Sequence, residues 1–203
     1  MKNLRSYLIL FMRNTPFNKL TYTVVDTETT GYSPKYAKMV EIAAVKIYPD
    51  YQIDYKDTFS ALINPEIEIP YNAYKIHKIS NEMVQDKPLV HEVLPSFLSF
   101  ASQSIIVGHN INFDMRFIEH EAACCSLELP FPYSIDTVKL AKKAVPGLPA
   151  YKLDNLIDYF NINISLPESD RHRALFDAVN TAIVLTECFK ILEKQGICDI
   201  SHL

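Results

Sequence analysis

Two carboxylates, Asp26 and Glu28, directly follow the mainly apolar run 22–25 in this chain of 203 residues. The run predicts a buried strand, and side chains two residues apart on a strand point to the same face. Burying two like charges is costly unless a cation compensates them, and Mg²⁺ or Mn²⁺ prefers oxygen ligands of this kind. The pair therefore indicates a divalent-metal site. Residues 29–31, which read TTG, leave the alternative of an acidic turn after a strand.

A third carboxylate, Asp114, ends the segment 108–114, which reads GHNINFD. The segment follows the apolar run 105–107 and leads into a helical pattern, so Asp114 is expected in the first turn of a helix. An acid at that position can complement the helix dipole, with Asn110 or Asn112 as the cap. Asp114 alone is therefore compatible with a structural role as well as a chemical one.

The segment 171–178, RHRALFDA, places His172 and Asp177 at the start of the longest helical pattern in the chain. Five residues rotate by about 140° around a helix, so the two side chains would not share a face within one. They converge only if His172 lies on the loop or in the first turn and folds back. The alternative is a surface histidine followed by an aspartate that faces solvent.

Together the three segments resemble the motifs of the DEDDh, or DnaQ-like, exonuclease family: Asp-x-Glu, His-Asn-x-x-Phe-Asp and His-x-x-x-x-Asp. The stretches 40–45 and 151–156 also resemble the second strand of the family and the helix before its third motif. Each motif is weak by itself, whereas three in this order over residues 20–192 form a specific signal. The stretch 76–80 resembles the loop that usually reads His-Gly-Ile, but Lys78 stands where glycine is usual.

The resemblance implies a 3′–5′ exonuclease that releases nucleoside 5′-monophosphates with two Mg²⁺ or Mn²⁺ ions as cofactors. One ion would activate a water molecule and the other would stabilise the leaving 3′ oxygen, while His172 would accept the proton of that water as general base. The implied metal ligands are the four carboxylates Asp26, Glu28, Asp114 and Asp177. The implied substrate-binding residues are Thr30, His77, His109, Asn110 and Phe113.

The form of the motifs also bears on the substrate and the partners. The first two motifs favour the proofreading or repair branch of the family, which acts on 3′ ends of DNA, single-stranded DNA above all. A 3′–5′ exoribonuclease that trims RNA and a catalytically silent module that binds nucleic acid or protein are the alternatives. Proofreading members are tethered to the replicative polymerase by a tail, and residues 195–203 form a segment too short for such a tether. A freestanding enzyme is therefore expected.

The composition is that of a globular protein with a single main domain, since 48% of the residues are hydrophobic and the net charge is −4. The negative charge argues against a globally basic surface for nucleic acid, so metal ions must bring phosphate to the carboxylates. The four cysteines lack metal-ligand spacing and are expected to be reduced core thiols of a cytoplasmic protein. No apolar run reaches the length of a membrane span, so no membrane partner is expected.

The succession of elements predicts an α/β fold with a mixed five-stranded sheet flanked by helices, and the resemblance makes this fold ribonuclease H-like. An N-terminal extension over residues 1–18, expected to be helical, precedes an exonuclease domain over 19–203. Glu41 is a candidate to lie near the site, but a glutamate on a strand more commonly faces water, which is the expectation here. Asp136 is expected to cap a helix. The predicted strands lie near 21–26, 39–48, 55–63, 104–108 and 133–136, and the predicted helices near 90–102, 112–126, 137–144, 152–160 and 172–194.

Overall fold

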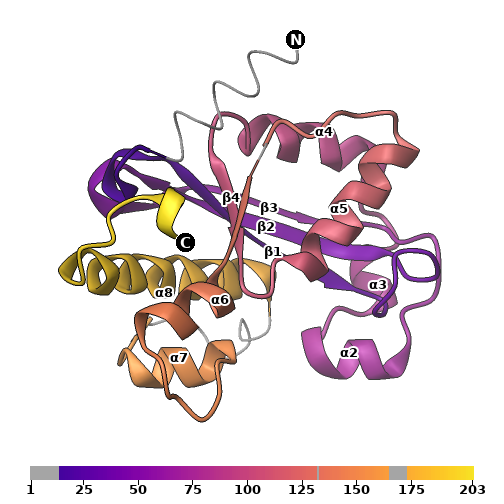
Figure 1. Cartoon of the computed structure of the whole chain (residues 1–203). Coiled ribbons are helices and arrows are strands. Elements are labelled where there is room, and N and C mark those ends of the chain that lie inside the picture. The colour runs from indigo at the N-terminus through magenta and orange to yellow at the C-terminus, as the bar shows by residue number, and fades with distance from the viewer. Residues whose placement is uncertain (1–13, 132, 165–172) are drawn as a thin grey trace.

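A computed structural model describes residues 14–131, 133–164 and 173–203 of the chain. The helix expected near the N-terminus and the expected general base His172 lie outside these residues. The described part forms one five-stranded sheet with helices on both faces (Figure 1), which confirms the predicted mixed α/β architecture.

The central strand of the sheet is the one that ends in the first motif. The five strands are β1 (Tyr22–Thr29), β2 (Met39–Tyr48), β3 (Gln52–Leu62), β4 (Ile105–Gly108) and β5 (Ser134–Asp136). They lie in the order β3-β2-β1-β4-β5, in which β1, β2 and β3 pair antiparallel while β4 and β5 join in parallel. β1 pairs with β4 only over residues 22–24, so the carboxylates at its end are held by the pairing with β2, where Asp26 lies opposite Ala43 and Glu28 opposite Glu41.

Three predicted helices cover the sheet. The long helix α8 (Ala174–Lys194) lies against one face, while α4 (Val90–Phe100) and α5 (Asn112–Cys124) lie against the other (Figure 1). The predicted bounds of all three agree with the structure to within two residues at each end. α6 (Thr137–Ala144) and α7 (Leu153–Tyr159) pack against α8. Asp136 caps α6 as expected, because its carboxylate accepts a hydrogen bond from the Val138 N–H.

Two short helices stand where the sequence predicted no regular structure. They are α2 (Tyr71–His77) and α3 (Asn81–Val84), and they lie beside the end of β1 (Figure 1). Helices of two turns or fewer give too few repeats for a periodic pattern, and α2 has no capping side chain because Pro70 precedes it. The described 3₁₀ helices are η1 (Phe17–Lys19), η2 (Pro49–Tyr51) and η4 (Ile200–His202).

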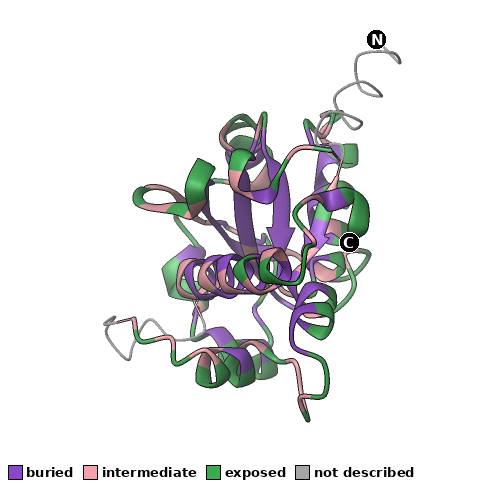
Figure 2. Ribbon diagram, turned by 60° about the vertical axis from the view of Figure 1, so that its left-hand side comes forward, coloured by how far each residue is buried: buried purple, intermediate pink, exposed green. Residues whose placement is uncertain are grey.

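Alternation along β1 divides its side chains between two hydrophobic cores. Val24 faces the core beneath α8, whereas Val25 faces the core beneath α4 and α5. Figure 2 shows the result, with buried strands between helices that are buried on their inner sides. Since Asp26 and Glu28 keep the parity of Val24, both carboxylates point to the face that α8 covers.

The ends of the described chain add detail to this packing. Phe17, within the predicted N-terminal extension, is fully buried and stacks on Phe189 of α8 with 4.2 Å between the ring centroids. The four cysteines are free thiols, but only Cys188 lies in the core, so the expectation of core thiols is wrong for the other three. None of the described helices is long and apolar enough to cross a membrane.

Lys78 ends α2 in a left-handed backbone conformation, with φ 59° and ψ 15°. This conformation costs a residue with a Cβ about 1–2 kcal/mol, while glycine adopts it freely. The glycine that is usual at this position of the family therefore matches the backbone, and Lys78 tolerates a local strain. Lys78 thus adopts the backbone conformation that glycine would adopt at the end of α2.

We expect the substitution Lys78→Gly to raise the free energy of unfolding by about 0.5–1 kcal/mol, because relief of the strain exceeds the entropy that glycine gains in the unfolded chain. Denaturant titration measures the change. Lys75→Gly is the matched control, since Lys75 lies within α2, where glycine should cost about 1 kcal/mol. A loss of stability with Lys78→Gly would show that the lysine side chain contributes more than its backbone strain costs.

Candidate metal centre

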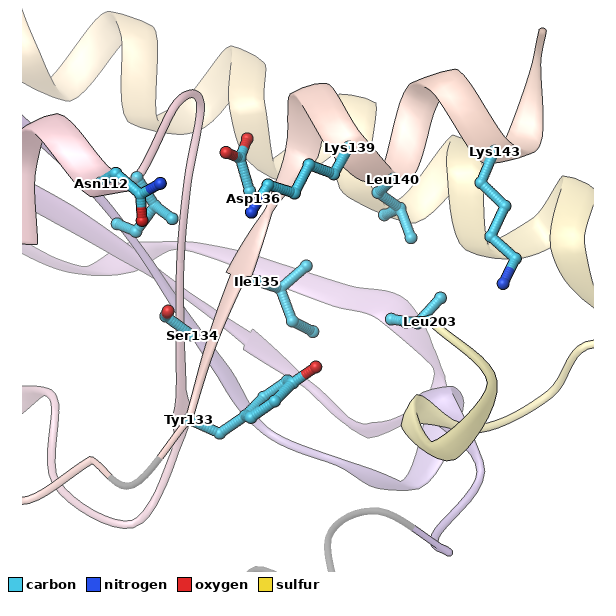
Figure 3. A pocket seen from close by; sticks show the side chains of 10 residues that line it. Asn112, Tyr133, Ser134, Ile135, Asp136, Lys139, Leu140, Lys143 and Leu203 are labelled. Atoms are coloured by element: carbon cyan, nitrogen blue, oxygen red, sulfur yellow. The ribbon is translucent and has the colours of Figure 1, made fainter.

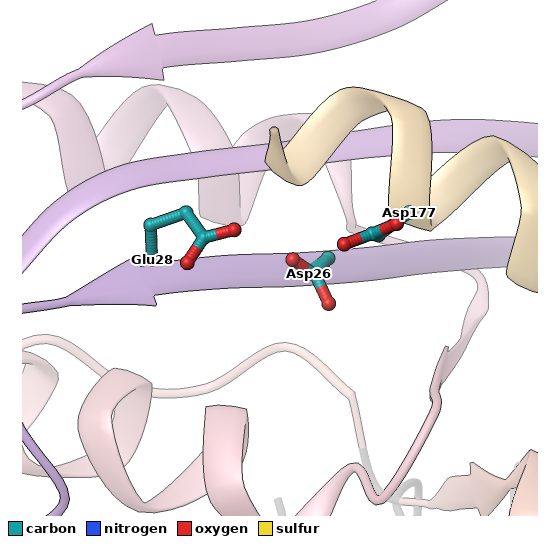
Figure 4. A group of neighbouring side chains, drawn as sticks. All are labelled: Asp26, Glu28 and Asp177. Carbon is teal, nitrogen blue, oxygen red and sulfur yellow. The ribbon is translucent and has the colours of Figure 1, made fainter. Parts of the chain in front are cut away.

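Three carboxylates from the end of β1 and the first turn of α8 form a cluster. One oxygen atom of each of Asp26, Glu28 and Asp177 lies within 4.8 Å of the others (Figure 4). Two ligands on opposite sides of Mg²⁺ lie about 4.2 Å apart, given bonds of about 2.1 Å. Small side-chain movements would therefore let all three carboxylates bind one ion. Each of them is also partly exposed, so an ion and a substrate can reach the cluster.

Small side chains let α8 come close to the sheet at this point. Ala178 and Ala182 lie one turn apart on α8 and are fully buried, and Ala43, the cross-strand partner of Asp26, is fully buried as well. A larger residue at any of these positions would push the helix away from the strands, because the interior is closely packed. The position of Asp177 thus depends on the alanines beside it.

Asp114, the fourth predicted ligand, reaches the end of β1 from the opposite side of the sheet. It is buried, and its Oδ1 accepts hydrogen bonds from the backbone N–H of Thr27 at 2.9 Å and from the Thr27 hydroxyl at 2.7 Å. Thr27 points to the α5 face because it alternates with Asp26 and Glu28. Asp114 therefore fastens α5 to β1, and it lies outside the three-carboxylate cluster while close enough for its charge to act on Asp26.

Burial and mutual repulsion raise the pKa values of these acids in the metal-free protein. Burial raises the pKa of Asp26 well above its ordinary range, and the charges of Asp114, Glu28 and Asp177 raise it further. Burial, and then the charge of Asp177, raise the pKa of Glu28 to about 9. Burial raises the pKa of Asp114 to about 7, although its hydrogen bonds from Thr27 oppose the shift. A bound divalent cation would reverse the balance and favour the ionised forms.

Glu41 is buried at the same place, which corrects the expectation that it faces water. It is the cross-strand partner of Glu28, so both point to the α8 face. Its carboxylate accepts hydrogen bonds from the Arg173 guanidinium, the shortest at 2.6 Å, and from the Ala174 N–H at 3.1 Å. The one signal of this role in the sequence is a glutamate inside the otherwise apolar stretch 40–45, which implies a buried partner or an exposed face, and the partner lies 132 residues away.

A pocket of about 200 Å³ opens beside Glu28, between the end of β1, the loop after it and α2. His77 and Phe113 both line this pocket, as the resemblance implied for substrate-binding residues. Nδ1 of His77 accepts a hydrogen bond from the Ile79 N–H, so Nε2 carries the proton of the neutral ring. Nε2 is buried near the backbone of Thr29, but it forms no hydrogen bond of normal geometry within the described chain. Burial lowers the pKa of His77, which keeps the ring neutral.

The other three residues implied as substrate contacts do not line this pocket. The hydroxyl of Thr30 is buried and accepts a hydrogen bond from the Lys38 N–H, which closes the loop after β1. His109 and Asn110 line a different, open pocket next to residues 148–153, and the Nδ1 atom of His109 lies 2.9 Å from the Thr137 hydroxyl. Neither Asn110 nor Asn112 caps α5, because Ile111 is the N-cap residue and no side chain caps the helix.

A further cavity lies between α5, β5, α6 and the C-terminal 3₁₀ helix (Figure 3). Among the residues that line it, Asp136 bears the one carboxylate, and that carboxylate accepts hydrogen bonds from the N–H groups of Asn110 and Val138. Lys139 and Lys143 also line this cavity. The cavity lacks the grouped carboxylates of the cluster at the end of β1, so the latter is the candidate metal centre.

Comparison with known proteins identifies the family to which this arrangement belongs. The family model RNase_T, described as "Exonuclease", matches residues 23–185 and so spans all three motifs. The chain belongs to the DnaQ-like, or RNase T, exonuclease family. It is 34% identical to the DNA polymerase III subunit epsilon of Rickettsia conorii over 192 residues, which cover 89% of this chain and 81% of that subunit. Within this family, the chain is similar to the epsilon subunits of DNA polymerase III over most of its length.

Three further comparisons show the extent of the similarity. The chain is 36% identical to the DNA polymerase III PolC-type of Caldanaerobacter subterraneus over 182 residues, but these cover only 12% of that long protein. The structure of Exonuclease X in complex with 5′ overhanging duplex DNA superposes with a TM-score of 0.67 at 32% identity, covering 86% of this chain and 93% of that one. Cell-death related nuclease 4 has a TM-score of 0.71 at 17% identity over 87% of this chain and 65% of that one, which supports the ribonuclease H-like fold.

The raised pKa values predict how the stability of this DnaQ-like exonuclease depends on pH without metal. The folded state holds protons on Asp114 and Glu28 that the unfolded state loses near pH 3.8 and 4.5. Because the folded state binds more protons, the free energy of unfolding should fall as pH rises from about 5, through about 7 for Asp114 and about 9 for Glu28.

Denaturant unfolding in EDTA at several pH values between 5 and 9 measures this slope. The double variant Asp26→Asn with Glu28→Gln is the matched control, because amides of the same shape cannot titrate, and its slope should be clearly smaller. Saturating Mn²⁺ should also flatten the slope of the unmodified protein by binding only the folded state. Equal slopes in the two proteins would contradict the clustered-carboxylate account.

Proposed function

We propose that this chain is a metal-dependent 3′–5′ exonuclease that releases nucleoside 5′-monophosphates from single-stranded 3′ ends of DNA. The observation that carries the proposal is the cluster of Asp26, Glu28 and Asp177 beside a pocket large enough to receive part of a nucleotide. Membership of the exonuclease family supports the reaction class. The direction of digestion, the metal and the substrate belong to the proposal.

The donor set fits Mg²⁺ or Mn²⁺, since hard divalent cations prefer carboxylate oxygens. Asp26, Glu28 and Asp177 would hold the first ion, and Asp26 would bridge to a second ion supported by Asp114, directly or through water. When bound, the two ions supply an activated water and stabilisation of the leaving 3′ oxygen. The hydrogen bonds from Thr27 to Asp114 would leave its second carboxylate oxygen for this role.

The side chains of the pocket beside Glu28 would hold the terminal nucleotide. Phe113 offers a ring face for the base or the sugar, and its own packing on Phe117 fixes its orientation, with 5.3 Å between the ring centroids. The Nε2–H of His77 supplies a buried donor at the pocket, and a donor of this kind favours a sugar hydroxyl or a phosphate oxygen. Thr30 would hold the loop that borders the pocket, because both its backbone N–H and its hydroxyl are hydrogen-bonded to the backbone of Lys38, at 2.9 Å each.

The names of the relatives support DNA over RNA as the substrate. The similar proteins include subunits of DNA polymerase III, and Exonuclease X was solved with duplex DNA that carries a 5′ overhang. With a net charge of −4, the protein is better suited to bind a few nucleotides at the end of a DNA strand than to hold a long stretch of phosphates on a basic surface. RNA trimming is the second candidate activity, and one assay distinguishes it from digestion of DNA.

Digestion of matched DNA and RNA oligonucleotides with Mg²⁺ or Mn²⁺ tests the proposal. We expect single-stranded DNA with a free 3′ end to yield nucleoside 5′-monophosphates faster than RNA of the same sequence. A blocked 3′ end should stop the reaction, whereas a blocked 5′ end should not. The double variant Asp26→Ala with Glu28→Ala should be folded and inactive. Activity of that variant would refute the metal centre, cleavage of a circular strand would refute the exonuclease, and faster digestion of RNA would refute the DNA preference.

For His172 we propose the role of general base, and the variant His172→Ala should lower turnover at least about a hundredfold, the usual scale of this loss. The acidic limb of the pH–rate profile should disappear with it, since an imidazole near its ordinary pKa of about 6.5 must be neutral to accept a proton. His91→Ala, an exposed histidine on α4, is the matched control. A variant of His172 with the original rate and pH profile would remove the residue from the mechanism.

A further inference from the structure

The ion pair between Glu41 and Arg173 joins the strand beside the candidate metal centre to the helix that supplies Asp177. Nε of Arg173 donates to both carboxylate oxygens of Glu41, at 3.0 and 3.2 Å, and Nη2 donates to Oε1 at 2.6 Å. The Glu41 side chain is only 2% exposed, whereas that of Arg173 is 27% exposed. This forked geometry fixes the guanidinium in distance and in plane.

Glu41 also supplies the cap that α8 lacks from its own sequence. Arg173 occupies the N-cap position and its side chain makes no capping hydrogen bond. The first N–H of the helix, that of Ala174, donates instead to Oε2 of Glu41 at 3.1 Å. A carboxylate at a helix N-terminus is stabilised by free N–H groups and by the helix dipole. One side chain of β2 therefore holds the first turn of α8 at two adjacent residues.

The register of the sheet turns this attachment into a constraint on the carboxylate cluster. Glu41 is the direct cross-strand partner of Glu28, and Asp177 lies one helical turn after Arg173, to whose carbonyl its N–H donates at 3.2 Å. A displacement of the Arg173 end of α8 thus moves Asp177 relative to Glu28. The candidate ligands of β1 and α8 keep their spacing because both elements are tied to Glu41.

Stability alone does not explain such a pair. Replacing a buried ion pair by apolar residues of similar volume is often neutral or stabilising, because both charges lose hydration. Glu41 also adds a fourth acid to a place already crowded with them, and its charge raises the pKa values of Asp26 and Glu28. The pair therefore adds repulsion to the cluster, but it fixes the geometry at the start of α8.

We propose that Glu41 and Arg173 are positioning residues, which fix the first turn of α8 on β2 so that Asp177 stands at metal-binding distance from Asp26 and Glu28. The proposal rests on the metal-dependent function proposed above. Arg173 directly follows His172 in the sequence, so the same ion pair fixes the residue next to the proposed general base. Neither residue needs to touch the substrate for this role.

The test combines Mn²⁺ affinity without DNA, measured by calorimetry, with kcat, KM and melting temperature for a set of variants. Glu41→Gln keeps an oxygen for the Ala174 N–H and removes the charge, while Arg173→Gln removes the other partner. Arg173→Lys keeps the charge without the fork and, at a half-buried position, is the variant least able to disturb folding. Glu187→Gln, in the exposed pair with Lys190 on the same helix, is the matched control.

We expect Glu41→Gln and Arg173→Gln each to weaken Mn²⁺ binding and to lower kcat by about 10- to 100-fold, the usual effect of removing a partner that orients metal ligands. KM should change by less than about twofold, because no substrate contact is lost. The Mn²⁺ affinity and the kcat of Arg173→Lys should lie between those of these variants and those of the unmodified protein. The double variant Glu41→Gln with Arg173→Gln should have an Mn²⁺ affinity and a kcat no lower than those of the more impaired single variant, since the two residues act as one unit.

The outcomes separate this proposal from the proposed function. Variants that fold, bind Mn²⁺ and turn over like the unmodified protein would overturn the positioning role and leave the exonuclease intact. A raised KM with unchanged Mn²⁺ affinity in the Arg173 variants would also overturn it, by making Arg173 a substrate contact. An unmodified protein that neither binds Mn²⁺ nor cuts DNA would overturn the proposed function and this proposal with it.

Discussion

Repulsion between acids that the fold brings together at the end of β1 is the constraint on which the rest of the structure depends. Strand alternation puts Asp26 and Glu28 on one face, α8 adds Asp177, and the sheet register adds Glu41. Without a cation, the protein reduces this repulsion by holding protons, as the raised pKa of Glu28 indicates. Such an arrangement is costly, so it is informative: an acid cluster of this kind is stable in its ionised form only with a compensating ion.

The scaffold around the cluster holds the acids against this repulsion by attachments on both faces of the sheet. On one face, the fork between Glu41 and Arg173 and the small alanines of α8 set the distance of Asp177. On the other face, Thr27 binds Asp114 through its N–H and its hydroxyl, which ties α5 to the same strand. Alternate residues of β1 therefore face different helices: Asp26 and Glu28 face α8, and Thr27 binds α5.

Much of this arrangement follows from sequence, because it depends on local periodicity. The strand parity of Asp26 and Glu28, the bounds of α8 and the cap at Asp136 all come from patterns a few residues long. The features that could not be predicted depend on distant partners or on very short elements. The partner of Glu41 is the N-cap residue of α8, 132 residues away, so local sequence does not show that Glu41 is buried. The short α2 gives too few repeats for a helical signal. His109 turns to Thr137 because the residues after β5 lie beside the end of β4.

The most direct test of the central claim is the number of protons released when Mn²⁺ binds. Calorimetric titrations in buffers of different ionisation enthalpy measure this number for the unmodified protein at pH 7 and at pH 9.5. Because Glu28 has a pKa of about 9 and Asp114 of about 7 in the metal-free protein, binding at pH 7 should release at least about one proton, and binding at pH 9.5 markedly fewer. Absence of binding, or a binding enthalpy that is the same in every buffer at pH 7, would contradict the claim that a divalent cation relieves the repulsion of these carboxylates.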